Sequence, residues 1–86
     1  MAAYSIEIRK SAAKELESIR GRDQERIIEK ILSLANDPRP PGSKKLSGEE
    51  KYRIRQGDYR ILYEIKDQVP IIVVVRIRHR RDVYRK

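Results

Sequence analysis

A run of five apolar residues, Ile71 to Val75, leaves this chain few ways to fold. Successive side chains of a β-strand point to opposite faces of a sheet, so a strand of this composition has two faces to bury. We expect it in the interior of a sheet, with a strand over 3–9 as its candidate neighbour. Short polar turns at 56–58 and 66–68 separate it from two more alternating segments. Together these segments predict an antiparallel meander with strands over 52–55, 59–65 and 69–77.

The first half of the chain predicts one strand and two helices. Residues 3–9 alternate apolar and polar side chains, as a half-buried strand does. Apolar residues at helical spacing then predict helices over 12–20 and 23–35, with Ser11 and Asp23 as N-caps. Prolines and a glycine in 36–43 predict a stiff loop. In the second helix the residues expected to face the core are Ile27, Ile28, Ile31, Leu32 and Leu34.

This order of elements predicts an α+β fold in which a helix hairpin packs on a mainly antiparallel sheet. At 86 residues the chain is expected to form one domain over 1–86, because a chain of this size buries only roughly 60–65% of its unfolded surface. It has no cysteine, which excludes a disulfide framework, a thiolate nucleophile and a Cys-based zinc site. With no secretory leader in view, a cytoplasmic location is expected. The longest apolar run, 69–75, falls far short of the roughly 20 residues that cross a bilayer, so no membrane partner is expected.

The charge of the chain is concentrated in its second half. The formal net charge is +8. Residues 1–42 hold eight basic and seven acidic side chains, a balance of +1, whereas residues 43–86 hold thirteen and six, a balance of +7. Such a field attracts polyanions. Nucleic acid is the commonest of these, and an anionic membrane or an acidic protein remains an alternative on composition alone.

Arginines gather on one predicted sheet face. Strand alternation places Arg53 and Arg55 on one face of the strand over 52–55, and Arg60 can meet them across the turn. The default interpretation of any single strand arginine is a solvated side chain. Like charges at adjacent cross-strand positions repel each other, however, so a cluster of three indicates an anion between them. Guanidinium groups match phosphate oxygens and would stabilise a pentacovalent phosphorus.

Few catalytic chemistries fit the remaining residues. The sequence holds one histidine, and no spacing typical of a metal site, a Ser-His-Asp triad or a phosphate-binding glycine loop. An enzyme of this composition would therefore use metal-free phosphoryl transfer, in which the 2′-hydroxyl of RNA attacks its own phosphodiester.

Three segments of the second half resemble the signature of RelE-type toxins of bacterial and archaeal toxin–antitoxin modules. They are Leu46-Ser-Gly48, Tyr52-Arg-Ile-Arg-Gln-Gly-Asp-Tyr-Arg-Ile-Leu-Tyr-Glu-Ile65 and His79-Arg-Arg-Asp-Val-Tyr-Arg85. The resemblance covers the whole chain. It implies a RelE-like fold and a ribosome-dependent endoribonuclease that cuts mRNA in the A site. It also implies a RelB-like antitoxin as partner, and neither a metal nor another cofactor.

The resemblance assigns roles to matching positions. Arg60 and its neighbours Arg53 and Arg55 would hold the scissile phosphate. Arg80 would stabilise the leaving oxygen or donate a proton to it. Tyr84 would stack on an mRNA base, although a phenol near a chain end is by default a packing residue. The other cations of this half are expected to contact RNA or the ribosome: Lys44, Lys45, Lys51, Arg76, Arg78, Arg81 and Arg85.

The proton acceptor stays open. Relatives often carry lysine at positions 53 and 55, and arginine, with a pKa above about 12, is a poor general base. His79 or Lys51 could take this role, or catalysis could rest mainly on positioning and charge. Two further functions are alternatives: inhibition of DNA gyrase, as in ParE-like toxins, and RNA binding without catalysis.

Overall fold

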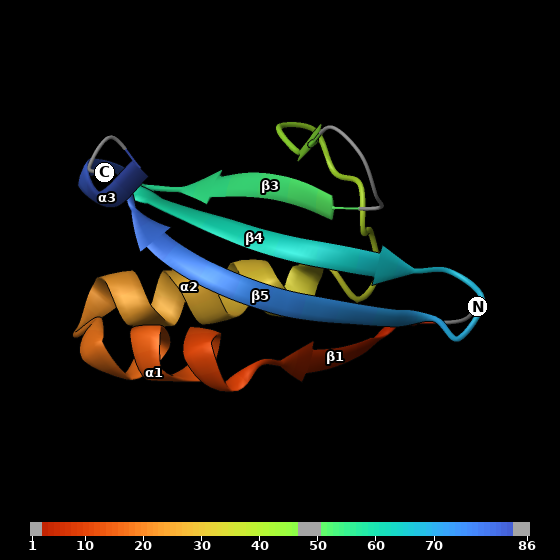
Figure 1. The fold of residues 1–86 in the computed structure, drawn as a ribbon, viewed down its shortest axis with the longest axis horizontal. Helices are drawn as coiled ribbons and strands as arrows, with labels where there is room; N and C mark the ends of the chain where they lie inside the picture. Colours follow the sequence, from red (N-terminus) through yellow and green to blue (C-terminus); the bar gives the residue numbers. More distant parts are fainter. Residues whose placement is uncertain (1–2, 47–50, 84–86) are drawn as a thin grey trace.

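The computed structural model describes residues 3–46 and 51–83, which form a sheet with two helices packed on one of its faces (Figure 1). Every helix and strand predicted from the sequence is present, with ends within two residues of the predicted bounds. The α+β class is thereby confirmed. In chain order the elements are β1 Ser5–Ile8, α1 Lys10–Ser18, α2 Arg22–Ser33, β2 Lys44–Lys45, β3 Lys51–Gln56, β4 Tyr59–Lys66, β5 Ile71–His79 and α3 Arg80–Val83.

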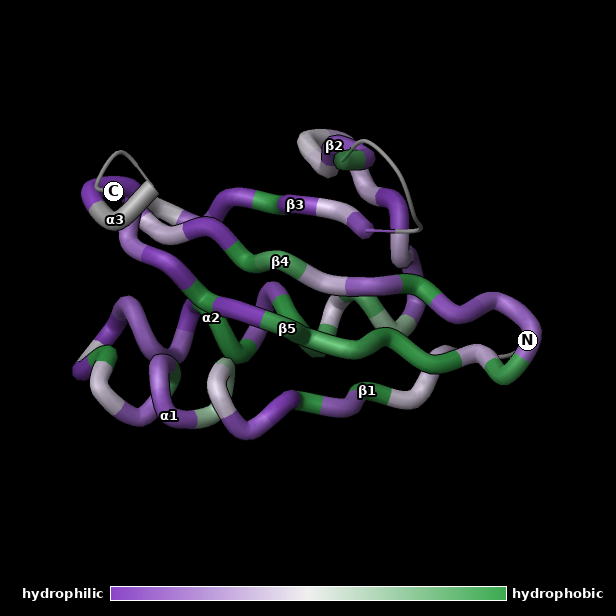
Figure 2. Tube along the Cα trace, in the orientation of Figure 1, coloured by the Kyte–Doolittle hydropathy of each residue, from purple (hydrophilic) through white to green (hydrophobic). Residues whose placement is uncertain are grey.

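The sheet has the order β1-β5-β4-β3-β2, so β5 lies between β1 and β4. The predicted interior position of the apolar strand is confirmed. β1 runs parallel to β5 and the other neighbours are antiparallel. Figure 2 shows that β5 is hydrophobic in the half that lies beside β1 and mainly hydrophilic toward α3. β2 was not predicted, because two adjacent lysines carry no apolar alternation.

Both predicted N-caps are wrong. α1 begins at Lys10, one residue before Ser11, and the Ser11 hydroxyl donates to the carbonyl oxygen of Val75 on β5 (3.1 Å). α2 begins at Arg22 after Gly21, whose φ of 70° suits a residue without a side chain. Asp23 therefore lies in the first turn, where its negative charge still favours the helix N-terminus.

The core fills the space between the helices and one sheet face. Ile27, Ile31 and Leu34 of α2 are buried there, as predicted. Ile28 and Leu32 are not: they are 38% and 58% exposed, because each is turned by about 100° from its buried neighbour around the helix. The sheet contributes Tyr52, Ile54, Ile61, Tyr63, Ile65, Ile72, Val74 and Ile77 to the core.

In the described part of the chain, no helix is long and apolar enough to span a membrane.

α1 takes over from β1 along the outer edge of β5. The pairing of β1 ends at Val74. Beyond it, the Glu15 carboxylate accepts a hydrogen bond from the backbone N–H of Ile77 (2.7 Å). Its other oxygen accepts two from the Arg76 guanidinium (2.8 and 3.1 Å). The edge of β5 nearest α3 is thus held by a side chain of α1 rather than by a strand.

A polar network ties the proline-rich loop to the end of the sheet away from α3. The Arg39 guanidinium donates to the Tyr52 hydroxyl and to Asp67 (both 3.0 Å), and the Tyr4 hydroxyl donates to the other oxygen of Asp67 (2.6 Å). The hydrogen bonds from Arg39 and then Tyr4 hold the pKa of the Asp67 carboxyl below its usual value. The loop is therefore held against β3 and the β4–β5 turn, and Asp67 of that turn also binds Tyr4, the residue before β1.

Tyr63 is expected to make the folded state less stable at alkaline pH. Its side chain is 1% exposed, and its hydroxyl donates to the Pro38 carbonyl (2.7 Å). Burial raises its pKa from 10.0 to about 12, so in this window the folded state keeps a proton that the unfolded state loses. Stability present below pH 10 should therefore fall as the pH rises toward about 12, by up to about 2 kcal/mol. Guanidinium chloride titrations across this range should show the decline for the wild type and a shallower one for Tyr63→Phe. An equal slope in both proteins would contradict the assignment.

Candidate functional site

The sheet face that the helices leave uncovered carries cations in rows that cross the strands. In the first row Arg55 of β3 lies opposite Arg60 of β4, which lies opposite Arg78 of β5. Opposed side chains on one face of an antiparallel pair have Cβ atoms only about 4.5–5.5 Å apart. Within residues 3–46 and 51–83, neither Arg55 nor Arg78 has an ion-pair partner. We call Arg55, Arg60 and Arg78 the arginine row.

A second row runs beside it, one side-chain repeat along the strands. Lys44 of β2 lies opposite Arg53, Arg53 opposite Leu62, and Leu62 opposite Arg76. The guanidinium of Arg76 is bound by Glu15, which raises the pKa of Arg76 and neutralises its charge locally. Arg76, one of the cations predicted to contact RNA, is thus held by an ion pair within the fold.

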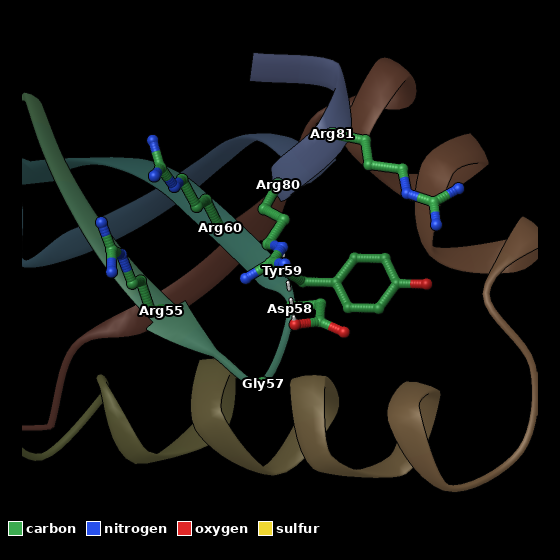
Figure 3. A pocket seen from close by; sticks show the side chains of 7 residues that line it. All are labelled: Arg55, Gly57, Asp58, Tyr59, Arg60, Arg80 and Arg81. Atoms are coloured by element: carbon green, nitrogen blue, oxygen red, sulfur yellow. Dashed lines mark ion pairs between the residues drawn. The ribbon is translucent and has the colours of Figure 1, made fainter. Parts of the chain in front are cut away.

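The arginine row leads into a cavity at the end of the sheet where β3, β4 and β5 meet α3. A tight turn at Gly57 and Asp58 joins β3 to β4, and Gly57 has the positive φ of 60° that such a turn demands. The cavity has a volume of about 360 Å³. Figure 3 shows its lining residues: Arg55, Gly57, Asp58, Tyr59, Arg60, Arg80 and Arg81.

α3 forms one wall of this cavity and contacts the turn between β3 and β4. The backbone N–H of Arg80 donates to the carbonyl of Asp58 (2.7 Å), and the Arg80 Nε lies 4.0 Å from the Asp58 carboxylate. In Figure 3 the side chains of Arg55 and Arg60 lie side by side, and Arg80 reaches toward Asp58. The lining therefore supplies four guanidinium groups and a carboxylate. Guanidinium groups can bind the oxygens of a phosphate and stabilise charge that develops on it.

His79 lies on the other face of the sheet. It is opposite Tyr59, next to Arg78 in sequence, so strand alternation turns it toward the helices. Its ring meets the Tyr59 ring edge-on, with centroids 5.1 Å apart, and its Nδ1 accepts the backbone N–H of Arg81 (3.1 Å). The structure does not bring this histidine to the arginine row.

Lys51 is also remote from the row. It lies opposite Glu64, two side-chain repeats along β3 from Arg55, which is about 13 Å. Lys45 lies opposite Tyr52, whose side chain is in the core, so Lys45 belongs to the helix-covered side of the sheet. Neither proton acceptor named from the sequence is thus beside the predicted phosphate site. Tyr84 and Arg85 lie outside the described residues.

Asp58 lines the cavity although it was not predicted from the sequence as a site residue. The segment 56–58 was recognised only as a turn, because Gly-Asp is an ordinary turn pair. Its position in the turn directly before the strand that carries Arg60 was an available signal, because it lies close to the predicted arginine cluster along the chain. What the sequence could not show is that α3 folds back onto the turn and completes the cavity.

No group of three or more potential metal-ligating side chains occurs among the residues that the structure describes. The site consists instead of guanidiniums, one carboxylate and the backbone of a tight turn.

Comparisons with known proteins agree on one family. A family model described as the ParE toxin of type II toxin–antitoxin systems matches residues 6–84. Toxin RelG of Mycobacterium tuberculosis is 29% identical to this chain over 96% of the chain and 98% of that protein.

Solved structures agree with the fold. The RelE–RelB complex of Pyrococcus horikoshii superposes with a TM-score of 0.83 at 28% identity, covering 91% of this chain and 96% of that one. The toxin–antitoxin complex RelBE2 of M. tuberculosis gives 0.81 at 27% identity, with coverages of 92% and 93%. These matches confirm the RelE-like fold that the signature segments predicted.

Proposed function

Because the chain belongs to the RelE/ParE superfamily of type II toxins, we propose that it is a ribosome-dependent endoribonuclease that cuts mRNA in the ribosomal A site. In this reaction the 2′-hydroxyl of one nucleotide attacks the adjacent phosphorus without a metal ion. The 5′-oxygen of the next nucleotide leaves. Cutting of the message would stop translation.

The observation that carries this proposal is the arginine row at the mouth of the cavity. Three guanidiniums in register on one uncovered face repel one another, and a phosphodiester would relieve that repulsion. Their planar forks match the oxygens of a phosphate, and half-buried Arg60 lies at the centre of the row. As negative charge builds on the phosphate oxygens, these donors bind the transition state more strongly than they bind the ground state.

We propose a RelB-like antitoxin as the protein partner. The solved relatives named above are complexes of RelE-type toxins with RelB-type antitoxins. An acidic, amphipathic segment is the partner that the +8 charge of this chain would attract. An antitoxin segment bound to the uncovered sheet face would exclude RNA from the arginine row.

The direct test is cleavage on programmed ribosomes. Purified protein is incubated with ribosomes that carry a defined mRNA, and primer extension maps the new ends. We expect cuts within the A-site codon, and none in the same mRNA without ribosomes. Folded protein that leaves the ribosome-bound mRNA intact would refute the nuclease function.

The second candidate is inhibition of DNA gyrase, because the matching family model is described by the name ParE. A supercoiling assay on the same preparation decides between the two. Loss of supercoiling together with intact mRNA would favour gyrase. The arginine row argues for the nuclease, since a protein that only blocks gyrase gains nothing from a phosphate site.

A further inference from the structure

We propose that the Asp58 carboxylate is the proton acceptor that activates the 2′-hydroxyl of the RNA. This inference rests on the proposed nuclease function. It assigns the general base to a residue in the cavity itself, in place of His79 and Lys51, which lie elsewhere.

The first reason is the chemistry of the lining. Arginine stays protonated throughout the physiological range and cannot accept a proton. A neutral phenol is no better, and the Tyr59 ring is turned toward His79. A carboxylate is in its proton-accepting form at neutral pH. Among the described residues that line the cavity, Asp58 alone therefore offers a side-chain base.

The second reason is how Asp58 is held. Gly57 sets the turn, and the Asp58 carbonyl accepts the first N–H of α3 at 2.7 Å, so the backbone of this residue is fixed from both sides. The carboxylate itself is only loosely engaged. Its oxygen lies 4.0 Å from the Arg80 Nε, and the two side chains are 65% and 68% exposed. An ion pair this exposed stabilises the fold only weakly, so a phosphate can draw Arg80 away from Asp58.

The third reason is the place of Asp58 relative to the arginine row. It lies two residues before Arg60, and Arg60 is opposite Arg55. A phosphate held between these arginines and Arg80 would place its neighbouring ribose near the turn, because Arg80 extends toward Asp58 (Figure 3). The charged groups that line the cavity together with Asp58 are Arg55 of β3, Arg60 of β4, and Arg80 and Arg81 of α3, and Arg80 is the one that forms an ion pair with it.

Asp58 takes the proton of the 2′-hydroxyl while the 2′-oxygen forms a bond to phosphorus. The bond from phosphorus to the 5′-oxygen breaks, which leaves a 2′,3′-cyclic phosphate on one fragment. The departing 5′-oxygen takes a proton from solvent water, and Asp58 returns its own proton to the hydroxide that remains. No other reactant is consumed.

A positioning role is the rival explanation, because Asp58 also contacts Arg80. If Asp58 served only to orient Arg80, its charge would have no value once Arg80 is gone. A proton acceptor would still be needed in an Arg80→Ala protein. A double-mutant cycle of these two residues therefore separates the roles.

The experiment measures single-turnover cleavage of ribosome-bound mRNA by wild type, Asp58→Asn, Arg80→Ala and the double variant. Asparagine keeps the size and the turn preference of aspartate. The control is Asp23→Asn, which removes the same charge from an exposed site in the first turn of α2. Binding is measured in parallel with mRNA that carries a 2′-O-methyl group at the cleavage site, which blocks proton removal. Thermal unfolding checks that each variant is folded.

We expect Asp58→Asn to cut about 100-fold more slowly, as loss of a general base does, in both the wild-type and the Arg80→Ala background. Binding of the methylated mRNA should be unchanged or tighter, and Asp23→Asn should cut at the wild-type rate. In a further variant, Asp58→Ala, added formate should partly restore cleavage, since a small carboxylate can take the place of the missing side chain. A loss that vanishes in the Arg80→Ala background, or a loss below about 3-fold in the single variant, would overturn this inference and leave the nuclease function intact. A wild-type protein that does not cut would overturn both.

Discussion

Arg60→Ala is expected to lower the rate of mRNA cleavage about 1,000-fold, the upper range for removal of one donor to a developing oxyanion. Arg60 lies at the centre of the arginine row, opposite Arg55 on one side and Arg78 on the other, and it also lines the cavity. Its half-buried side chain has fewer orientations to lose than an exposed one when it binds phosphate. Single-turnover cleavage on programmed ribosomes measures the effect.

Two further variants, Arg60→Lys and Arg20→Ala, serve as the comparison and the control for this prediction. Lysine keeps the charge but loses the bidentate fork, so Arg60→Lys should fall between wild type and Arg60→Ala. Arg20 is an exposed arginine after α1, outside the cavity, and Arg20→Ala should cut at nearly the wild-type rate. Because Arg60→Ala also relieves repulsion within the row, its melting temperature should not drop as its activity does. An Arg60→Ala protein within 10-fold of wild type, which is about 1.4 kcal/mol, would remove Arg60 from the reaction.

Strand alternation in the sequence predicted much of the fold and part of the candidate site. The face shared by Arg53, Arg55 and Arg60 follows from a period of two, and the five apolar residues of β5 follow from burial on both sides. Local patterns of this kind are set by neighbours in the chain. They predict which side of a strand a residue occupies without knowledge of the remaining structure.

Long-range placement could not be read in the same way. Arg78 lies opposite Arg60 only because β5 carries an irregularity that shifts its register against β4 between Leu62 and Tyr63. His79 lies between arginines in sequence, yet one residue of alternation puts it on the opposite face. Asp58 became part of a site only when α3 folded over the turn. Each of these positions depends on contacts between segments far apart in the chain.

The failed cap at Ser11 and the missed role of Glu15 have a common cause. Both side chains bond to β5 instead of to their own helix. Helix capping rules describe an isolated helix end. Here the edge of β5 beyond β1 leaves backbone groups that need partners, and α1 provides them.

Glu15→Ala is therefore expected to lower the free energy of unfolding by about 2–3 kcal/mol. The Glu15 side chain is 25% exposed and accepts three hydrogen bonds, from the Ile77 N–H and from two nitrogens of Arg76. Its removal leaves an edge N–H of β5 and a guanidinium without these acceptors. The loss is a large fraction of the total stability of a folded protein, which is typically about 5–15 kcal/mol. Urea titration followed by far-ultraviolet circular dichroism measures it.

Glu15→Gln and Glu17→Ala separate the charge from the position. Glutamine can still accept the Ile77 N–H but pairs no charge with Arg76, so we expect a loss of about 1 kcal/mol. Glu17 lies two residues further along α1 and is exposed. Removal of its carboxylate should change stability by less than about 0.5 kcal/mol. Equal losses for Glu15→Ala and Glu17→Ala would mean that α1 does not hold the edge of β5 through Glu15. If instead only Glu15→Ala unfolds at a lower urea concentration than the wild type, then β5, which leads into α3 and the cavity, depends on the Glu15 carboxylate. That carboxylate is 62 residues from Ile77 in sequence.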